Sequence, residues 1–408
     1  MSTAPDLLQL NPFHRLNQLL AGLTPGASPL PDGQPINLSV GDPRTTMPAF
    51  AAEAMRAAEA GWSRYAPARG HPGYLAAVQA WLTRRYALPA GFLDPARHIV
   101  PVAGSREGLF FAVQAAVAAK RAQLGGAAPV VLLPDPGYHV YAGATAAAGA
   151  EAIYVTVDAG SGQLPAYEAL PAAVLERAAL AFLCSPANPQ GAVADAARLA
   201  AALGHARRHG YVLAVDECYS EIYAAEAPTG GLRVAADGGS LEGLLVFNSL
   251  SKRSGAPGLR LGFVAGDPAM IRAIEGFLRF GGAGPGLPLL AAGEALWSDE
   301  AHVVANRAYY DRNLRLAERI LGNAFGWRRP AGGFFLWLDV SPGRFDDGEA
   351  AARALFTEGG ITFLPGAYLS VGRAAEAAVP GRRYLRASLA EPPAILEPVL
   401  TRVAEILL

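Results

Sequence analysis

Residues 211–223 read Tyr-Val-Leu-Ala-Val-Asp-Glu-Cys-Tyr-Ser-Glu-Ile-Tyr, and this segment decides the fold. An unbroken apolar run ends directly in a carboxylate, Asp216. A strand that is apolar on both faces is typical of a parallel sheet covered by helices on both sides. Ligands bind beyond the carboxyl ends of the strands in such sheets, so Asp216 is predicted to lie beside a ligand.

The same pattern continues in both directions along the chain. Further strands are predicted for the short apolar runs at residues 98–103, 130–134, 152–157, 180–184 and 244–247. Helices are predicted for the alanine-rich stretches at residues 105–120, 138–148, 167–177 and 194–209. This alternation indicates an α/β fold, in which a large domain has a mostly parallel sheet flanked by helices.

A smaller α+β domain is predicted after residue 286, where the pattern changes. Helices are expected at residues 287–297, 301–321 and 349–358, strands at 333–338, 361–364 and 382–389, and a helix at the C-terminus. We therefore expect an N-terminal arm and part of the small domain at residues 1–45, the large domain at 46–286 and the small domain at 287–408.

Composition excludes several classes of protein. The chain has 408 residues, a formal net charge of −1 and two cysteines without CxxC spacing, which favours a reducing cytoplasm. It has no basic block for nucleic acid, no secretion signal and no apolar run of the ~20 residues that a membrane helix needs. The histidines show no ligand spacing, so no metal site is predicted. We expect a cytoplasmic enzyme without nucleic-acid or membrane partners.

Lysine is scarce, because only Lys120 and Lys252 occur among the 34 basic residues. Residues 248–262 read Asn-Ser-Leu-Ser-Lys-Arg-Ser-Gly-Ala-Pro-Gly-Leu-Arg-Leu-Gly and surround Lys252 with the hydroxyl of Ser249 and the guanidinium of Arg260. These groups suit a phosphate dianion held beside a Schiff-base amine. A loop lysine is ordinarily a surface residue, but the hydroxyl and guanidinium groups around Lys252 favour a catalytic role for its amine. Lys120 is expected to be structural, at the C-terminal end of its helix.

Asp216 needs a cationic partner or several donors if it is buried, and a protonated pyridine nitrogen would be such a cation. Tyr219 could present its phenol to the oxygen of the same ring. The alternatives are a helix cap for Asp216 and a packed aromatic ring for Tyr219.

Three loops after predicted strands carry further candidates. Asn188 lies in a rigid turn at residues 185–191, which taken alone is only a turn. Ser105 and Arg106 begin a helix after Gly104, where free N–H groups attract an anion. Tyr138 could stack on a planar cofactor or pack in the core.

Arg386 lies within the last predicted strand. A buried guanidinium requires an anion, either a substrate carboxylate or a structural Asp or Glu.

Taken in their order along the chain, these motifs resemble the fold-type I aminotransferases of class I/II, which use pyridoxal 5′-phosphate (PLP). The resemblance spans nearly the whole chain. It implies that Lys252 forms the Schiff base and moves the proton between the substrate Cα and C4′ of the cofactor. Asp216 matches the partner of the pyridine nitrogen. Asn188 and Tyr219 match the residues that bond the ring O3′, and Tyr138 matches the stacking aromatic ring.

The resemblance also implies the remaining contacts. Ser105, Arg106, Ser249 and Arg260 match the phosphate cup. Arg386 binds the substrate α-carboxylate, with Asn188 and the backbone of Gly41 beside it. Tyr65 matches the tyrosine that reaches the phosphate in the neighbouring subunit, which implies a homodimer with shared active sites.

Within this family, the wording at residues 12–16, 216–223, 249–254 and 363–366 looks most like bacterial succinyldiaminopimelate transaminases of lysine biosynthesis, which use 2-oxoglutarate as the other partner. A distal substrate carboxylate would then need a cation, for which Arg44 and Arg69 are candidates by position. Other amino-acid aminotransferases of the aspartate, alanine or aromatic type, a PLP-dependent C–S lyase and a non-catalytic regulator remain alternatives.

Overall fold

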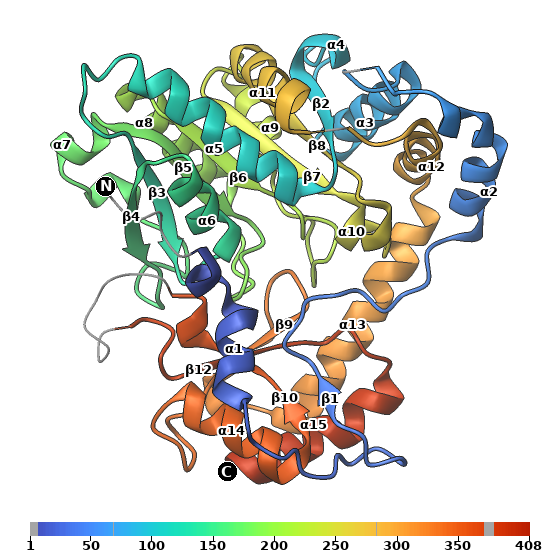
Figure 1. Ribbon diagram of the computed structural model, residues 1–408, viewed down its shortest axis with the longest axis vertical. Coiled ribbons are helices and arrows are strands. Elements are labelled where there is room, and N and C mark those ends of the chain that lie inside the picture. Colours follow the sequence, from blue (N-terminus) through green and yellow to red (C-terminus); the bar gives the residue numbers. More distant parts are fainter. Residues whose placement is uncertain (1–6, 68, 283, 371–378) are drawn as a thin grey trace.

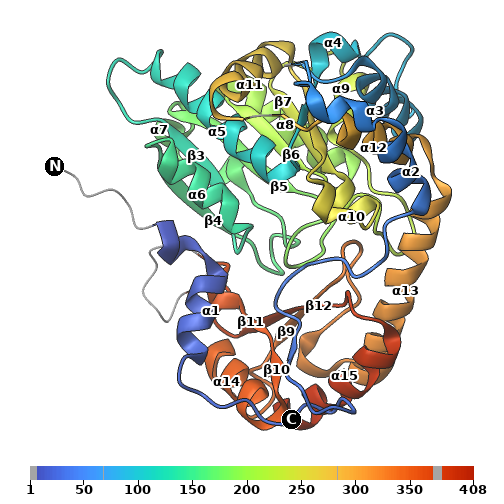
Figure 2. The same ribbon diagram turned by 45° about the vertical axis from the view of Figure 1, so that its right-hand side comes forward.

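The structure is a computed structural model and describes residues 7–67, 69–282, 284–370 and 379–408. Figure 1 shows a large α/β unit above a smaller one, with the long helix α13 (Ala301–Leu321) running from one to the other. The N-terminal segment follows the smaller unit before it crosses to the larger one (Figure 2).

A seven-stranded sheet forms the centre of the large unit, in the order β2-β8-β7-β6-β5-β3-β4. The strands are β2 (Ile99–Val102), β3 (Val130–Asp135), β4 (Glu151–Thr156), β5 (Ala178–Cys184), β6 (Val212–Asp216), β7 (Leu244–Ser249) and β8 (Gly262–Gly266). Only β8 is antiparallel to its neighbours. The predicted α/β fold with a mostly parallel sheet is confirmed.

The register of the sheet decides where the site lies. Cys184 on β5 pairs with Asp216 on β6, and Asp216 pairs with Phe247 on β7. These three strands therefore end at nearly the same level. The loops that follow them leave the sheet at one edge, which faces the smaller unit (Figure 1).

Helices cover both faces of the sheet. One face packs on α5 (Ser105–Arg121), α6 (His139–Ala147) and α11 (Pro268–Gly281). The other packs on α3 (Pro72–Arg85), α8 (Ala196–His209), α9 (Gly231–Asp237) and α12 (Leu287–Ser298). The shorter helices are α2 (Ala49–Ala57), α4 (Pro95–His98), α7 (Ala172–Leu175) and α10 (Leu250–Arg253). Because both faces are covered, the strands are apolar throughout, as the sequence indicated.

Two elements of the large unit differ from the prediction. The predicted helix at residues 167–177 was wrong: a 3₁₀ turn (Tyr167–Ala169) and the four-residue α7 stand there, separated by Pro171. Proline lacks the N–H of a helix interior and disfavours helix in the residue before it. Strand β8 was missed because glycines begin and end it, although Gly262 is needed, since a Cβ there would lie 2.5 Å from the carbonyl oxygen of Asn248.

The smaller unit has its own apolar core. A three-stranded antiparallel sheet has the order β11-β12-β9, and a two-stranded parallel sheet pairs β1 with β10. The strands are β1 (Ile36–Asn37), β9 (Phe335–Asp339), β10 (Ile361–Thr362), β11 (Leu364–Pro365) and β12 (Tyr384–Ser388), and the helices are α1 (Pro12–Leu20), α14 (Gly348–Gly359) and α15 (Pro393–Leu407). The strand expected at 361–364 is thus split between two sheets.

Helix α12 bears on where the small domain begins. Its Leu290, Leu296 and Trp297 are buried in the core that includes α3 and the large sheet. By contrast, Leu16 and Leu19 of α1 pack in the core of the smaller unit. We therefore propose that the small domain begins after α12, not at residue 287, and that it includes the N-terminal arm. Among the described helices, none combines the length and the apolar character needed to cross a membrane.

Candidate active site

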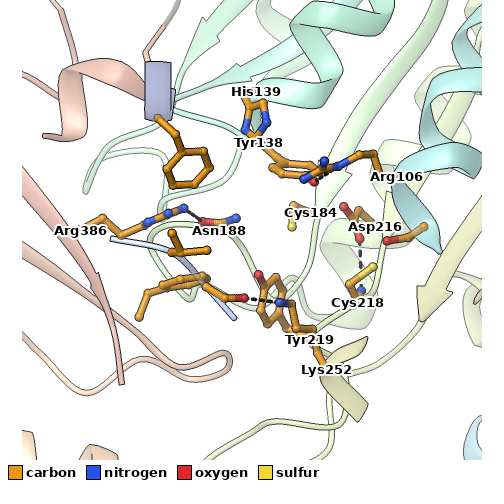
Figure 3. A pocket seen from close by; sticks show the side chains of 15 residues that line it. Arg106, Tyr138, His139, Cys184, Asn188, Asp216, Cys218, Tyr219, Lys252 and Arg386 are labelled. Carbon is orange, nitrogen blue, oxygen red and sulfur yellow. Dashed lines mark hydrogen bonds between the residues drawn. The ribbon is translucent and has the colours of Figure 1, made fainter. Parts of the chain in front are cut away.

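A cavity of about 150 Å³ opens where the carboxyl ends of the large sheet face the smaller unit (Figure 3). The predicted residues that line it are Gly41, Ser105, Arg106, Tyr138, Asn188, Asp216, Tyr219, Lys252 and Arg386. An adjoining cavity of about 310 Å³ adds Ser249 and Arg260. The fold therefore brings together every residue predicted to bind the cofactor or the amino-acid end of the substrate, except Tyr65.

Lys252 lies on the short helix α10 directly after β7, where Ser249 caps the helix by accepting a hydrogen bond from the Ser251 N–H. The Nζ of Lys252 donates to the carbonyl oxygen of Gly41, which belongs to the N-terminal segment. Burial lowers the pKa of the Lys252 amine to about 8. A sizeable fraction of the amine is therefore unprotonated near neutral pH, the form that attacks an aldehyde.

Asp216 ends β6 and is only 4% exposed. Its Oδ2 accepts a hydrogen bond from the Tyr141 hydroxyl at 2.7 Å and its Oδ1 accepts one from the Cys218 N–H at 3.2 Å. Burial raises the pKa of the Asp216 carboxyl, and these hydrogen bonds oppose the change. Among the described residues Asp216 has no ion pair, so a cation bound in the cavity would be its counter-ion.

Arg386 on β12 carries the opposite charge and is equally buried. Its Nη1 donates to Asn188 Oδ1 at 3.1 Å and its Nη2 to the Ser39 carbonyl at 2.6 Å. Its Nε has no partner in the described part of the chain. Burial lowers the pKa of Arg386 to about 10, and its described partners are all neutral. The structural partner considered above, an Asp or Glu, is therefore not found among the described residues.

The adjoining cavity has the character of an anion site. The guanidinium of Arg260 donates to the carbonyls of Pro257 at 2.8 Å and Ala103 at 3.2 Å. Gly104 has a φ of +80°, a conformation that favours glycine, and a Cβ there would lie 2.5 Å from Nη2 of Arg260, so a larger residue would displace this side chain. Ser105 then begins the 17-residue α5, whose N-terminal dipole favours an anion.

Tyr138 caps α6 beside the cavity, and Arg106 holds it by donating from Nε to the Tyr138 hydroxyl at 3.1 Å. The Arg106 side chain thus lies against the predicted stacking ring (Figure 3). Tyr219 lies across the cavity, where its ring packs edge-on against Phe334 and Phe335 at 5.6 and 5.7 Å between centroids.

Several lining residues were missed as site residues, chiefly Phe13, His139 and the two cysteines. His139 was predicted to have no role, yet its ring packs edge-on against both Tyr138 and Phe13. Burial, with Arg106 and Arg386 nearby, lowers the pKa of His139 to about 4, so the ring is neutral at physiological pH. Its position next to Tyr138 in the chain was the one local signal. For Phe13, only the family-like wording at residues 12–16 pointed to the site.

Three predicted residues lie outside the cavity. Tyr65 is fully exposed. Arg44 pairs with Glu391 at 2.9 Å, and Arg69 pairs with Glu275 at 2.6 Å. Within the described chain neither arginine lines the cavity, so neither can bind a distal carboxylate there without leaving its partner. Among the described residues no cluster of metal-ligating side chains was found.

The chain matches the aminotransferase class I and II family over residues 34–403. It is 33% identical over 340 residues to an LL-diaminopimelate aminotransferase of Desulforudis audaxviator, covering 81% of this chain and 82% of that protein. It is 32% identical to the 4-dedimethylamino-4-oxo-anhydrotetracycline transaminase OxyQ of Streptomyces rimosus, covering 80% and 90%. A crystal structure of an aminotransferase from Neisseria meningitidis superposes with a TM-score of 0.87 at 34% identity, covering 97% of this chain and 96% of that one.

The residues present fit the PLP cofactor of this family. A buried carboxylate without a cation among the described residues suits a pyridinium nitrogen, an amine of lowered pKa suits an aldehyde, and the cradle that Gly104 leaves beside Arg260 suits a phosphate. The unpartnered Nε of Arg386 suits a substrate carboxylate. The chain therefore belongs to the class I and II aminotransferases and is a PLP-dependent aminotransferase of fold type I.

Proposed function

We propose that this aminotransferase transfers the amino group of N-succinyl-LL-2,6-diaminopimelate to 2-oxoglutarate in lysine biosynthesis. The observation that carries the proposal is a pair of basic side chains on the two sides of the cavity, of which Arg386 is buried and Lys252 is half-buried. Lys252 supplies an amine of lowered pKa, and Arg386 supplies a guanidinium without an anion among the described residues. The two groups together suit an α-amino acid as substrate, because its carboxylate would lie against Arg386 and its Cα proton would lie within reach of Lys252.

Each residue then has a role toward the cofactor, which when bound supplies an electron sink. Asp216 holds the ring nitrogen protonated, and Tyr138 packs on the ring face. Asn188 and Tyr219 direct their polar groups to the ring oxygen. Lys252 removes the proton at Cα of the amino acid and delivers it to C4′ of the cofactor, two bonds away.

The phosphate contacts come from a second set of groups. Ser105, Ser249 and Arg260 bind the phosphate, and Arg106 supports it through its backbone N–H, while its side chain holds Tyr138. The carbonyl of Gly41 accepts a hydrogen bond from the Lys252 amine before the cofactor binds, and the backbone of Gly41 lies beside the substrate carboxylate afterwards.

The diaminopimelate skeleton is proposed for two reasons. The residue sequence of the motifs resembles that of enzymes that act on it, and a relative at 33% identity is named an LL-diaminopimelate aminotransferase. The succinyl group is favoured by the charges around the cavity. Asp216 is the one carboxylate among the described residues that line this cavity, and Asp42 lines the adjoining one, whereas Arg106 and Arg386 both line the first cavity. Succinylation replaces the distal ammonium by a neutral amide and adds a carboxylate, which suits the positive charge of these arginines.

We also propose a homodimer, because large apolar side chains are exposed on the surface of the single chain. Trp62, Tyr65 and Phe280 are large apolar or aromatic side chains that are 60%, 101% and 96% exposed. Large exposed apolar side chains are typical of interaction surfaces when they lie together, and Trp62 and Tyr65 are only three positions apart in the chain. A second copy of the chain would cover them and present Tyr65 to the phosphate in the partner site.

The test is a panel of amino donors assayed with 2-oxoglutarate: N-succinyl-LL-diaminopimelate, LL-diaminopimelate, aspartate, alanine and phenylalanine. We expect the succinylated donor to have a kcat/KM at least about tenfold above that of free LL-diaminopimelate. This corresponds to a difference of ~1.4 kcal/mol in binding free energy between the two distal groups. Higher activity with the free donor would reject the succinyl assignment alone. Release of pyruvate and ammonia without use of 2-oxoglutarate would instead identify a lyase.

A further inference from the structure

Tyr141 lies behind the cavity and has no part in the function proposed above. It is 1% exposed and does not line the cavity, yet its hydroxyl donates to Oδ2 of Asp216 at 2.7 Å. We propose that Tyr141 is a positioning residue that keeps the Asp216 carboxylate ionised and aimed at the ring nitrogen of the cofactor. This inference rests on the proposed role of Asp216.

The Tyr141 ring is held by two aromatic neighbours. It stacks on Phe182 of β5 at 4.1 Å between centroids and 11° between planes, and Tyr138 packs edge-on against it. The ring therefore has little freedom to turn, and the direction of its hydroxyl is set by the packing of α6 on the sheet.

The carboxylate of Asp216 needs such a donor. Its other oxygen, Oδ1, accepts the longer hydrogen bond from the Cys218 N–H, at 3.2 Å, and the Cys218 side chain also bonds to the carboxylate. Burial favours the neutral carboxylic acid, and a neutral acid is a poor counter-ion for a pyridinium. A phenol suits this task because burial raises the pKa of Tyr141 well above its usual range, so the hydroxyl stays a donor at any physiological pH.

Helix α6 joins this donor to the ring that faces the cofactor. Tyr138 caps the helix and Tyr141 follows one turn later, with the two rings edge-on at 5.6 Å between centroids. Packing of the one helix thus decides both where the predicted stacking ring lies and where the phenol that holds Asp216 lies.

The experiment compares Tyr141→Phe with Tyr167→Phe. Tyr167 is a matched control because its buried hydroxyl donates to the Phe182 carbonyl at 2.7 Å in the same region but does not contact Asp216. Each protein is loaded with PLP or with 1-deazapyridoxal phosphate, which has a C–H group in place of the ring nitrogen. The dissociation constants are measured, and the protonation of the ring nitrogen is read by NMR with ¹⁵N-labelled PLP.

We expect Tyr141→Phe to weaken PLP binding about tenfold, as for the loss of a hydrogen bond to a charged group, and to leave binding of the deaza compound within about twofold. Its ring nitrogen should shift toward the unprotonated signal. Tyr167→Phe should alter neither the ratio of the two affinities nor the NMR signal, even if it lowers thermal stability.

Equal loss of affinity for both compounds, or an unchanged ring-nitrogen signal, would overturn the inference, because either result indicates a purely structural role. If Tyr141→Phe does not fold, Tyr141→3-fluorotyrosine is used instead, because it keeps the ring and makes the hydroxyl a stronger donor. Its affinity for PLP divided by its affinity for the deaza compound should then exceed the wild-type ratio. A ratio at or below the wild-type value would also reject the inference. Failure of the proposed function looks different, because the wild-type protein would then form no adduct at Lys252 with PLP.

Discussion

Asp216 and Arg386 face the same cavity from the larger and the smaller unit of the fold, carry opposite charges and are each 4% exposed. The donors to Asp216, Tyr141 and Cys218, both belong to the larger unit. Arg386 draws on two other segments, Asn188 of the larger unit and Ser39 near the N-terminus, and its Nε has no described partner. The cofactor side is thus organised within one unit, whereas the substrate side depends on contacts between the two.

Replacing Lys252, whose amine lies between the cofactor side and the substrate side, should abolish both cofactor attachment and proton transfer. We expect Lys252→Arg to lower kcat by at least about 10⁴-fold, because the nucleophile and the proton carrier are the same group. Lys120→Arg is the matched control, since it keeps the charge and replaces the other lysine of the chain; it should retain full activity. Borohydride trapping and peptide mapping give the second readout, and an adduct found at position 120 in the wild type would contradict the assignment.

Neutralising the cofactor side tests whether Asp216 acts by its charge. Asp216→Asn should still bind PLP but lose about 10²–10³-fold in kcat, as for other single electrostatic groups in active sites. Glu217→Gln is the comparison, because Glu217 is also buried but bonds to Tyr86 and the Gly231 N–H. It should lower the free energy of unfolding and leave kcat nearly unchanged. Equal losses of kcat in both variants would mean that Asp216 is only structural.

On the substrate side, Arg386→Lys should raise the KM of amino donors about 10- to 100-fold with a smaller change in kcat. Lysine keeps the charge but cannot form the two parallel hydrogen bonds that a carboxylate accepts from a guanidinium. Arg383→Lys is the control, because Arg383 is exposed and pairs with Asp339. Steady-state kinetics separate the two, and an unchanged KM in the first variant would remove Arg386 from substrate binding.

The smallest effect concerns stability of the protein without cofactor. Burial lowers the pKa of Lys252 from 10.5 to about 8, so between these values the unfolded chain holds a proton that the folded protein does not. The free energy of unfolding contributed by this amine therefore rises as pH increases from 8 to 10.5, by at most about 1.4 kcal/mol per pH unit. Urea unfolding of wild type and Lys252→Met across this range measures it; a difference that does not change with pH would show an unperturbed amine.

The cofactor side was the more predictable of the two. Asp216 and Lys252 each follow an apolar strand, and strands with two covered faces can be found from local sequence. The glycine-rich β8 was missed because close approach to Asn248, not intrinsic propensity, selects its first residue. Tyr141 could not be recognised at all, since a tyrosine in an alanine-rich helix looks like any core aromatic until its hydroxyl is seen to reach Asp216.

The sequence by itself determined six of the seven strands of the large sheet, the polar residues that end them and the scarcity of lysine, because these depend on residues that are neighbours in the chain. Tertiary structure alone decided that Phe13 reaches His139, that Gly41 accepts the Lys252 amine and that α12 packs in the large core. These contacts join segments more than one hundred residues apart, or choose between two available cores. They follow from how whole elements pack, and local sequence carries no record of that packing.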